Sequence, residues 1–288
     1  MEDTLPTNGH GANGHYTNGH TNGHTNGQSA HDFAPNERAY YQNGHHENGG
    51  IPPKPHQSTV SQVYAPVSKP GNPGPLGLIS FALTTFCLGF YQCGVGLPGA
   101  NSFGTVGPYQ VIFGLALFMG GAAQLIAGIM EFTVGNTFGT TVHCSYGAFW
   151  LSFALTIYPN SGVASAYGDD ERAFSVHIGI YLIAWFLVTF LFLLAALRTN
   201  IAIILVFSFL SLAFLFLACA EFVRTTHPST GLKLNQAGGA FAVIDACCAF
   251  YAGFAGVMTE DTTWVRFPLG ELNYQAPIKK LRSNEKHH

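Results

Sequence analysis

The sequence predicts an all-α membrane protein, a six-transmembrane-helix bundle with a disordered N-terminal tail. Composition is the first observation: 48% of the 288 residues are hydrophobic and 9% are charged, whereas soluble domains are about 25% charged. The second is a series of six apolar runs, each close to the roughly 20 residues that a helix needs to cross a bilayer. The third is an amino-terminal region with few aliphatic residues.

Residues 1–71 form this polar tail, in which the tripeptide Asn-Gly-His occurs five times. Such a stretch buries too little apolar area to offset its ordering entropy, so we expect disorder. Histidine-rich tracts can bind metals, but no second ligand type recurs at a fixed spacing. We therefore predict no metal site. No charged region followed by a short apolar region precedes the first apolar run, so we expect no cleaved signal peptide. We also predict no cofactor.

The six apolar runs define a transmembrane domain over residues 72–260, followed by a C-terminal tail at 261–288. They cover residues 76–97, 109–130, 140–158, 176–197, 201–220 and 237–258. Glycine- and proline-containing turns separate most of them. Only three residues join the fourth run to the fifth, which predicts a tight helical hairpin.

The positions of Lys and Arg predict the orientation. If the N-terminus lies inside, nine basic residues are on the inner side and three are in outer loops; the nine are Arg38, Lys54, Lys69, Arg198, Arg266, Lys279, Lys280, Arg282 and Lys286. Cytoplasmic loops carry the excess of basic residues in membrane proteins. Both termini are therefore expected in the cytoplasm.

Small residues predict where helices pack closely. Gly114, Gly121 and Gly128 recur every seven residues in the second run, and small residues follow a similar stripe in the sixth. Small residues let neighbouring backbones approach each other within membranes. Both stripes are therefore expected to be helix contacts.

The first apolar run opens with the heptapeptide NPGPLGL. Asn72 can cap the helix, and Pro73 suits its first position because proline has no N–H to leave unsatisfied. One interpretation is simply a well-capped helix. The other is that the positive helix end receives an anion on the N–H groups of Gly74, Leu76 and Gly77.

Polar side chains within the runs are functional candidates because lipid makes them costly. Gln124 lies beside the glycines of the second run, and Thr141, Ser145 and Tyr146 lie in the third. They either line a polar path or hydrogen-bond between helices. The sequence leaves both interpretations open.

Asp245 is the one carboxylate deep inside a run. We expect it to point inward, where it would carry a proton, pair with His143, or stay neutral and hydrogen-bond a backbone carbonyl. Glu131 and Glu221 end the second and fifth runs, where exposure at the membrane surface is an open interpretation.

Patterns of the common enzyme classes are missing from the sequence. It contains no phosphate-binding loop, dinucleotide fingerprint, zinc-protease motif or nucleophile elbow. It has no basic patch that would indicate a nucleic-acid partner, and its six cysteines lack metal-ligand spacing. We predict a protein that is not an enzyme and has no catalytic residue, a channel or carrier for something small.

Several segments resemble the acetate uptake transporter family of bacteria and fungi. The opening heptapeptide is similar to the family signature NPAPLGL, with Gly74 in place of alanine. Further similar segments lie at residues 120–128, 131–139, 145–151 and 237–239. The resemblance covers about residues 70–260, and the long polar tail looks fungal.

This resemblance implies a plasma-membrane permease that takes up acetate and other short monocarboxylates with protons. It also implies a pore through each protomer and assembly as a homohexamer. An apolar constriction would consist of Phe81, Tyr146 and Leu210, the last placed by counting from Arg198. The complete predicted pathway is Asn72, Gly74, Leu76, Gly77, Phe81, Gln124, Glu131, Tyr146, Leu210 and Asp245.

Two other functions stay open. Some fungal members of the family are linked to ammonium export, and a buried carboxylate such as Asp245 would attract a cation. His143 and Asp245 stand where small or apolar residues are expected in relatives. The third possibility is a membrane sensor that signals through its N-terminal tail.

Overall fold

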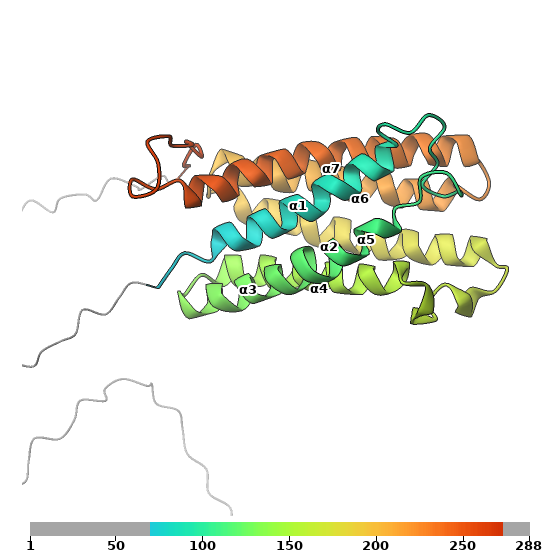
Figure 1. The fold of residues 1–288 in the computed structure, drawn as a ribbon, viewed down its shortest axis with the longest axis horizontal. Coiled ribbons are helices and arrows are strands. Elements are labelled where there is room, and N and C mark those ends of the chain that lie inside the picture. Colours follow the sequence, from blue (N-terminus) through green and yellow to red (C-terminus); the bar gives the residue numbers. More distant parts are fainter. Residues whose placement is uncertain (1–69, 273–288) are drawn as a thin grey trace, which may run out of the picture. The chain divides into compact units, whose positions relative to one another are not determined.

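The computed structural model describes residues 70–272, which form a bundle of long helices lying side by side (Figure 1). The tail predicted at 1–71 lies outside the described residues except for its last two positions, and so does the chain after residue 272. The elements are α1 (Gly74–Cys93), η1 (Gln110–Ile112), α2 (Phe113–Leu115), η2 (Ala116–Ala123), α3 (Gln124–Thr133), α4 (Thr137–Ile157), η3 (Pro159–Ser161), η4 (Ser165–Tyr167), α5 (Glu171–Ala196), α6 (Ile201–Val223) and α7 (Pro228–Val257).

Five helical stretches in the described part are long and apolar enough to cross a membrane. They are Gly74–Cys93, Gln110–Thr133, Glu171–Ala196, Ile201–Val223 and Pro228–Val257. The second of these runs through η1, α2, η2 and α3 without a break, and its η2 segment is π-helical. The third predicted run corresponds to α4, which has 21 residues but carries Thr, His, Cys, Ser and Tyr and is not among the five.

Several predicted boundaries need correction. Helix α1 begins at Gly74 and not at Pro73, which is the residue before it. It ends at Cys93 and not at residue 97, because Gly94 adopts a left-handed conformation with φ +68°. Helix α7 begins nine residues earlier than the apolar run, since its first turns are helical but polar.

Side-chain caps fix the starts of three helices. At the start of α4, Asn136 accepts the N–H of Gly139 (3.0 Å). Asp170 accepts the N–H of Ala173 at the start of α5, and Asn200 accepts the N–H of Ile203 at the start of α6. Helix α5 ends at Ala196 and α6 begins at Ile201, so the predicted tight hairpin is present. Asn200, the last residue of the joint in this hairpin, caps α6 and therefore sets where the first turn of α6 begins.

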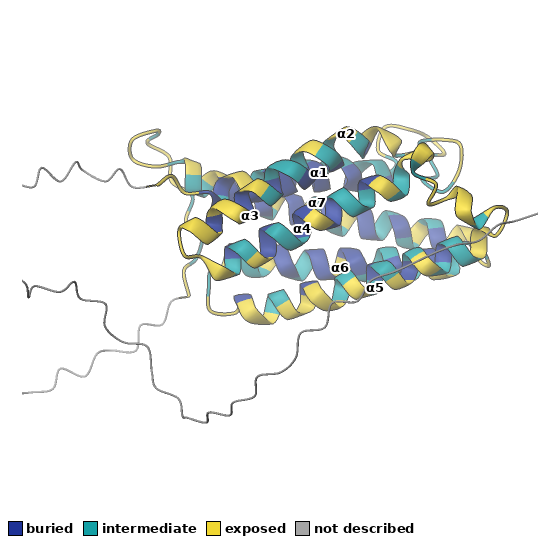
Figure 2. Cartoon of the chain, turned by 90° about the horizontal axis from the view of Figure 1, so that it is seen from below, coloured by how far each residue is buried: buried dark blue, intermediate teal, exposed yellow. Residues whose placement is uncertain are grey.

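Helix α7 packs against both α1 and α6, while α3 and α4 pack against each other. A methyl group on Gly121 would lie 2.6 Å from the Leu151 side chain, and one on Gly128 would lie 2.6 Å from Cys144. The prediction of close packing is therefore confirmed at these two glycines. Within the described residues a methyl group on Gly114 would meet no neighbouring atom within 4 Å, so this glycine is not at a helix contact within the protomer. Buried faces point to the bundle interior and exposed ones line its outside (Figure 2).

Part of the segment after α7 returns to the start of α6. The N–H of Ile201 donates to the carbonyl of Gly270 at 3.0 Å, and the N–H of Leu272 donates to the carbonyl of Thr199 at 2.9 Å. These bonds satisfy backbone groups that a helix start otherwise leaves bare. They also hold the α5–α6 joint in place.

Candidate functional site

A cavity of about 410 Å³ lies at the N-terminal end of α1; we call it the proximal cavity. Residues of α1, α3, α4, α5 and α6, of the α3–α4 turn and of the α5–α6 joint surround it. Its lining residues are Gly74, Leu78, Phe81, Gln124, Glu131, Asn136, Phe138, Gly139, Val142, His143, Tyr146, Ala195, Thr199, Asn200, Ile203, Val206, Phe207 and Leu210.

The polar groups of the proximal cavity come from α3, α4, the turn between them and the α5–α6 joint. Asn136 uses both ends of its amide, because Oδ1 caps α4 and Nδ2 donates to Glu131 Oε2 at 2.7 Å. The side chain of Glu131 is buried, and this hydrogen bond ties its carboxylate to the turn that begins α4. Sequence reasoning left Glu131 open as an exposed interfacial residue, which is wrong.

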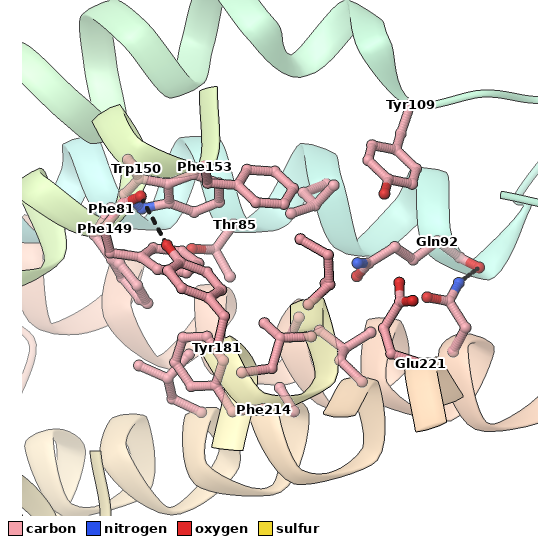
Figure 3. A pocket seen from close by; sticks show the side chains of 18 residues that line it. Phe81, Thr85, Gln92, Tyr109, Phe149, Trp150, Phe153, Tyr181, Phe214 and Glu221 are labelled. Carbon is pink, nitrogen blue, oxygen red and sulfur yellow. Dashed lines mark hydrogen bonds between the residues drawn. The ribbon is translucent and has the colours of Figure 1, made fainter. Parts of the chain in front are cut away.

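A second cavity of about 60 Å³ lies further along α1, toward its C-terminal end; we call it the distal cavity. Figure 3 shows it from close by, with Gln92, Tyr109 and Glu221 gathered at one end and large aromatic rings at the other. Its lining residues are Phe81, Thr85, Leu88, Gln92, Tyr109, Phe149, Trp150, Phe153, Ile178, Tyr181, Leu182, Leu210, Ala213, Phe214, Leu217, Glu221, Asn235 and Ala242.

Glu221 holds the polar end of the distal cavity. Its Oε2 accepts the hydroxyl of Ser175 at 2.9 Å and the Nε of Arg224 at 2.7 Å. Asn235 on α7 donates to the backbone carbonyl of Gln92 on α1 at 3.3 Å. Exposure of Glu221 at the membrane surface, left open from the sequence, is therefore also wrong: the residue is buried and paired.

Phe81 and Leu210 line both cavities and are themselves buried, so they form a common wall. Tyr146 lies against this wall, with its ring centroid 5.8 Å from that of Phe81. Its hydroxyl hydrogen-bonds Thr189 Oγ1 on α5 at 2.7 Å. The structure thus brings together the three residues expected at the constriction.

The residues of the opening heptapeptide lie in different surroundings. Asn72 is exposed, and its Oδ1 accepts the N–H of Gly74 at 3.1 Å. Gly74 lines the proximal cavity, whereas Leu76 is 40% exposed and lines neither cavity. Gly77 packs against His143, since a methyl group on it would lie 2.5 Å from the imidazole Nδ1.

Asp245 is fully buried, but it lines neither cavity. Neither of its carboxyl oxygens has a hydrogen-bond partner within the described part of the chain, so the possible pairing with His143 is not present. Gly238 of α7 packs on Leu217 of the antiparallel α6. Because the two helices are antiparallel, Asp245, seven residues after Gly238, is level with Leu210, seven residues before Leu217.

Sequence reasoning missed the polar end of the distal cavity. Gln92, Glu221 and Asn235 lie on three helices and far apart in the sequence, and no local pattern joins them. Thr141 and Ser145, which were candidates for a polar path, line neither cavity. Within residues 70–272, no three His, Cys, Asp or Glu side chains come together in a way that would hold a metal ion.

Comparison with known proteins gives a family. Residues 56–274 match the model described as the GPR1/FUN34/yaaH family. Ammonia transport outward protein 2 of Saccharomyces cerevisiae is 39% identical over 201 residues, 70% of this chain and 66% of that protein. Acetate permease A of Emericella nidulans is 32% identical over 256 residues, 83% of each chain. Three fungal relatives at 39% to 41% identity are matched over 62% to 69% of their length.

Among solved structures, the fold resembles the one titled "Structure of the bacterial acetate channel SatP". The match has a TM-score of 0.57 and 28% sequence identity, and it covers 70% of this chain and 100% of the bacterial one. With the apolar helices described above, these relatives identify a multi-pass membrane protein of a family of transporters and channels.

Proposed function

The chain belongs to the GPR1/FUN34/yaaH family, and we propose that it is a permease for acetate and other short monocarboxylates. The observation that carries this proposal is the wall that Phe81 and Leu210 form between two cavities. Two buried apolar side chains between partly polar spaces suit the passage of one small molecule at a time. The names of the fungal acetate permease and the bacterial acetate channel support the same substrate.

The substrate path runs through the proximal cavity, past the wall and into the distal cavity. The helix start at Asn72 and Gly74 attracts the acid, and Gln124 and Glu131 offer polar contacts before the wall. Tyr146 narrows the passage beside Phe81 and Leu210. Gly77 contributes indirectly, because it packs against His143, which lines the proximal cavity. For Leu76 and Asp245, which line neither cavity, we propose no contact with substrate.

We propose a plasma-membrane protein with six spans, in which α4 adds one span to the five apolar helical stretches. This assignment is supported by the packing of α4 on α3, where Gly147 lies against the backbone of Leu125. The excess of Lys and Arg on one side puts both termini, and hence the tails at 1–71 and 261–288, in the cytoplasm. Uptake is coupled to protons, and the protomers assemble as a homohexamer.

An ammonium pathway in the same fold is the second candidate. The observation that favours it is Asp245, a carboxyl without a hydrogen-bond partner in the described residues, level with the wall. A carboxylate there would attract a cation. The name of the yeast ammonia transport protein agrees with this reading.

Uptake of labelled acetate into liposomes that hold the purified protein tests the permease. Saturable uptake that rises as the external pH falls, above protein-free liposomes, is expected. Leu210→Trp should block uptake, because the larger side chain closes the passage between the two cavities. The matched control is Leu187→Trp, at a position that is 54% exposed on α5; it should leave uptake unchanged.

Two further measurements separate the alternatives. Transport of methylammonium that acetate does not inhibit would favour the ammonium pathway. Equal uptake by Leu210→Trp and Leu187→Trp would reject the wall as the path. If neither substrate moves, deletion of residues 1–71 tests the sensor, which should lose its signalling role with the tail.

A further inference from the structure

Two buried side chains of the proximal cavity carry polar atoms that lack a partner. Gln124 is 1% exposed and His143 is 6% exposed, and both line the cavity. Gln124 Oε1 and His143 Nδ1 make no hydrogen bond within residues 70–272. Leaving a buried polar atom unpaired costs about 1–3 kcal/mol, so a molecule that completes these bonds is favoured in the cavity.

The two side chains lie on either side of Tyr146 along the bundle. Gly128 of α3 packs on Cys144 of α4, and Gly147 of α4 packs on Leu125 of α3. This antiparallel register places Gln124 level with the turn just after Tyr146, whereas His143 lies one turn before it. Gln124 and His143 therefore occupy two successive levels of the proximal cavity, one on each side of Tyr146.

The free atoms define what a bound molecule must offer. The carbonyl oxygen of a glutamine accepts hydrogen bonds, so its partner must bring a donor. A carboxylate anion has only acceptors and cannot fill this role, whereas a protonated carboxylic acid has one O–H donor and one carbonyl acceptor. The neutral imidazole of His143 likewise offers one donor and one acceptor.

The wall that follows favours the same form of substrate. Phe81 and Leu210 are apolar, and transfer of an ionised carboxylate into apolar surroundings costs far more than transfer of a neutral acid. The other titratable groups of the cavity lining are already engaged: Glu131 accepts a hydrogen bond from Asn136, and the hydroxyl of Tyr146 bonds Thr189. Helices α1 and α6 contribute no titratable side chain to this lining.

We propose that Gln124 and His143 are specificity-determining residues that bind the substrate as the neutral, protonated acid. This inference rests on the proposed permease function and adds the chemical form in which the substrate enters. The two side chains accept a hydrogen bond from the O–H group of the acid and donate one to its carbonyl oxygen. A neutral molecule of the same shape with an N–H donor, such as acetamide, then fits the same positions, and an acid that stays ionised does not.

Competition against labelled acetate in liposomes that hold the full-length protein tests the proposal. Acetamide should inhibit uptake equally at pH 5 and pH 7, whereas trifluoroacetate, an anion at both pH values, should not inhibit. Gln124→Leu and His143→Phe should raise the KM for acetate about three- to tenfold, as expected for one lost hydrogen bond. His143→Asn, which restores an amide near the ring nitrogen, should recover most of the affinity.

Thr84→Val is the matched control, because Thr84 is fully buried and lines neither cavity. It should leave the KM unchanged and the acetamide inhibition intact. Inhibition by trifluoroacetate but not by acetamide would overturn the proposal, and so would an unchanged KM in both Gln124→Leu and His143→Phe. Inhibition by methylammonium without acetamide would assign the positions to a cation and overturn it too.

Failure of the permease itself gives a different result, namely no saturable acetate uptake by the unmodified protein. Thermal unfolding of the purified protein then decides the inference on its own. An increase in Tm with acetamide that Gln124→Leu abolishes would support the two positions as a binding site. No increase in Tm would overturn it.

Discussion

Replacing Gly77 with alanine should destabilise the protein through His143. A methyl group on Gly77 would lie 2.5 Å from both Cε1 and Nδ1 of the imidazole, whereas nonbonded carbon atoms prefer about 3.5–4.0 Å. The ring must therefore move by about 1 Å. Overpacking of this kind costs about 1–3 kcal/mol, against a gain of up to about 1 kcal/mol from the better helix propensity of alanine.

Gly114→Ala is the matched control, since nothing lies within 4 Å of the added methyl group. It gains the same helix propensity without a clash, so its Tm should equal or exceed that of the unmodified protein. Gly77→Ala should unfold earlier than Gly114→Ala by about 1–3 kcal/mol, which corresponds to several degrees at about 2–4 °C per kcal/mol for a domain of this size. Thermal unfolding in detergent measures both.

A second substitution identifies the cause. In a His143→Ala background the ring is gone, so Gly77→Ala should raise the Tm as Gly114→Ala does. The coupling between the two sites is then the overpacking energy itself. If Gly77→Ala is equally harmful with and without the imidazole, or raises the Tm in the unmodified protein, the contact does not limit this site and the reasoning is refuted.

Four further changes test other contacts. Tyr146→Phe removes one hydrogen bond and should cost about 1 kcal/mol, whereas Tyr146→Ala leaves a large void and should cost about 3–5 kcal/mol; similar Tm losses would argue against this. Glu221→Gln should lower the Tm, and adding Arg224→Gln should cost less than the sum of the two changes, because they share one ion pair; full additivity would contradict the pair. Asp245→Asn should not lower the Tm, because no partner within residues 70–272 is lost; a large drop would reveal an ion bound to the carboxylate. Phe81→Ala should raise butyrate uptake relative to acetate by widening the wall, and an unchanged ratio would place the limit elsewhere.

Local chemistry carried the predictions that succeeded. Apolar length located the long helices, the short α5–α6 joint followed from three residues, and Gly121 and Gly128 marked a real helix contact. The same seven-residue spacing does not put Gly114 at a contact within the protomer, because π-helical residues of η2 lie between Gly114 and Gly121 and change the number of residues per turn. The early start of α7 was missed because its first turns are helical without being apolar.

Features that depend on contacts between distant segments could not be predicted. Glu221 ends an apolar run in the sequence, and only the neighbouring helix shows that Ser175 donates to it and that it is buried. The distal cavity joins Gln92 of α1 to Asn235 of α7. His143 looked like an exception to a family pattern; the space for its ring comes from the missing side chain of Gly77 on another helix.

In the pathway that we propose, the position of the wall would let one bundle discriminate by both charge and size. Polar side chains stand on each side of it, with Gln124 and His143 in the proximal cavity and Glu221 and Asn235 at the far end of the distal one. At the wall itself a molecule leaves the first set of hydrogen bonds before it reaches the second. The energy of that step is set by desolvation, which is smallest for a small neutral molecule. In the permease that we propose, hydrogen bonds in the proximal cavity would therefore select the form that can cross, and the wall would exclude the form that cannot.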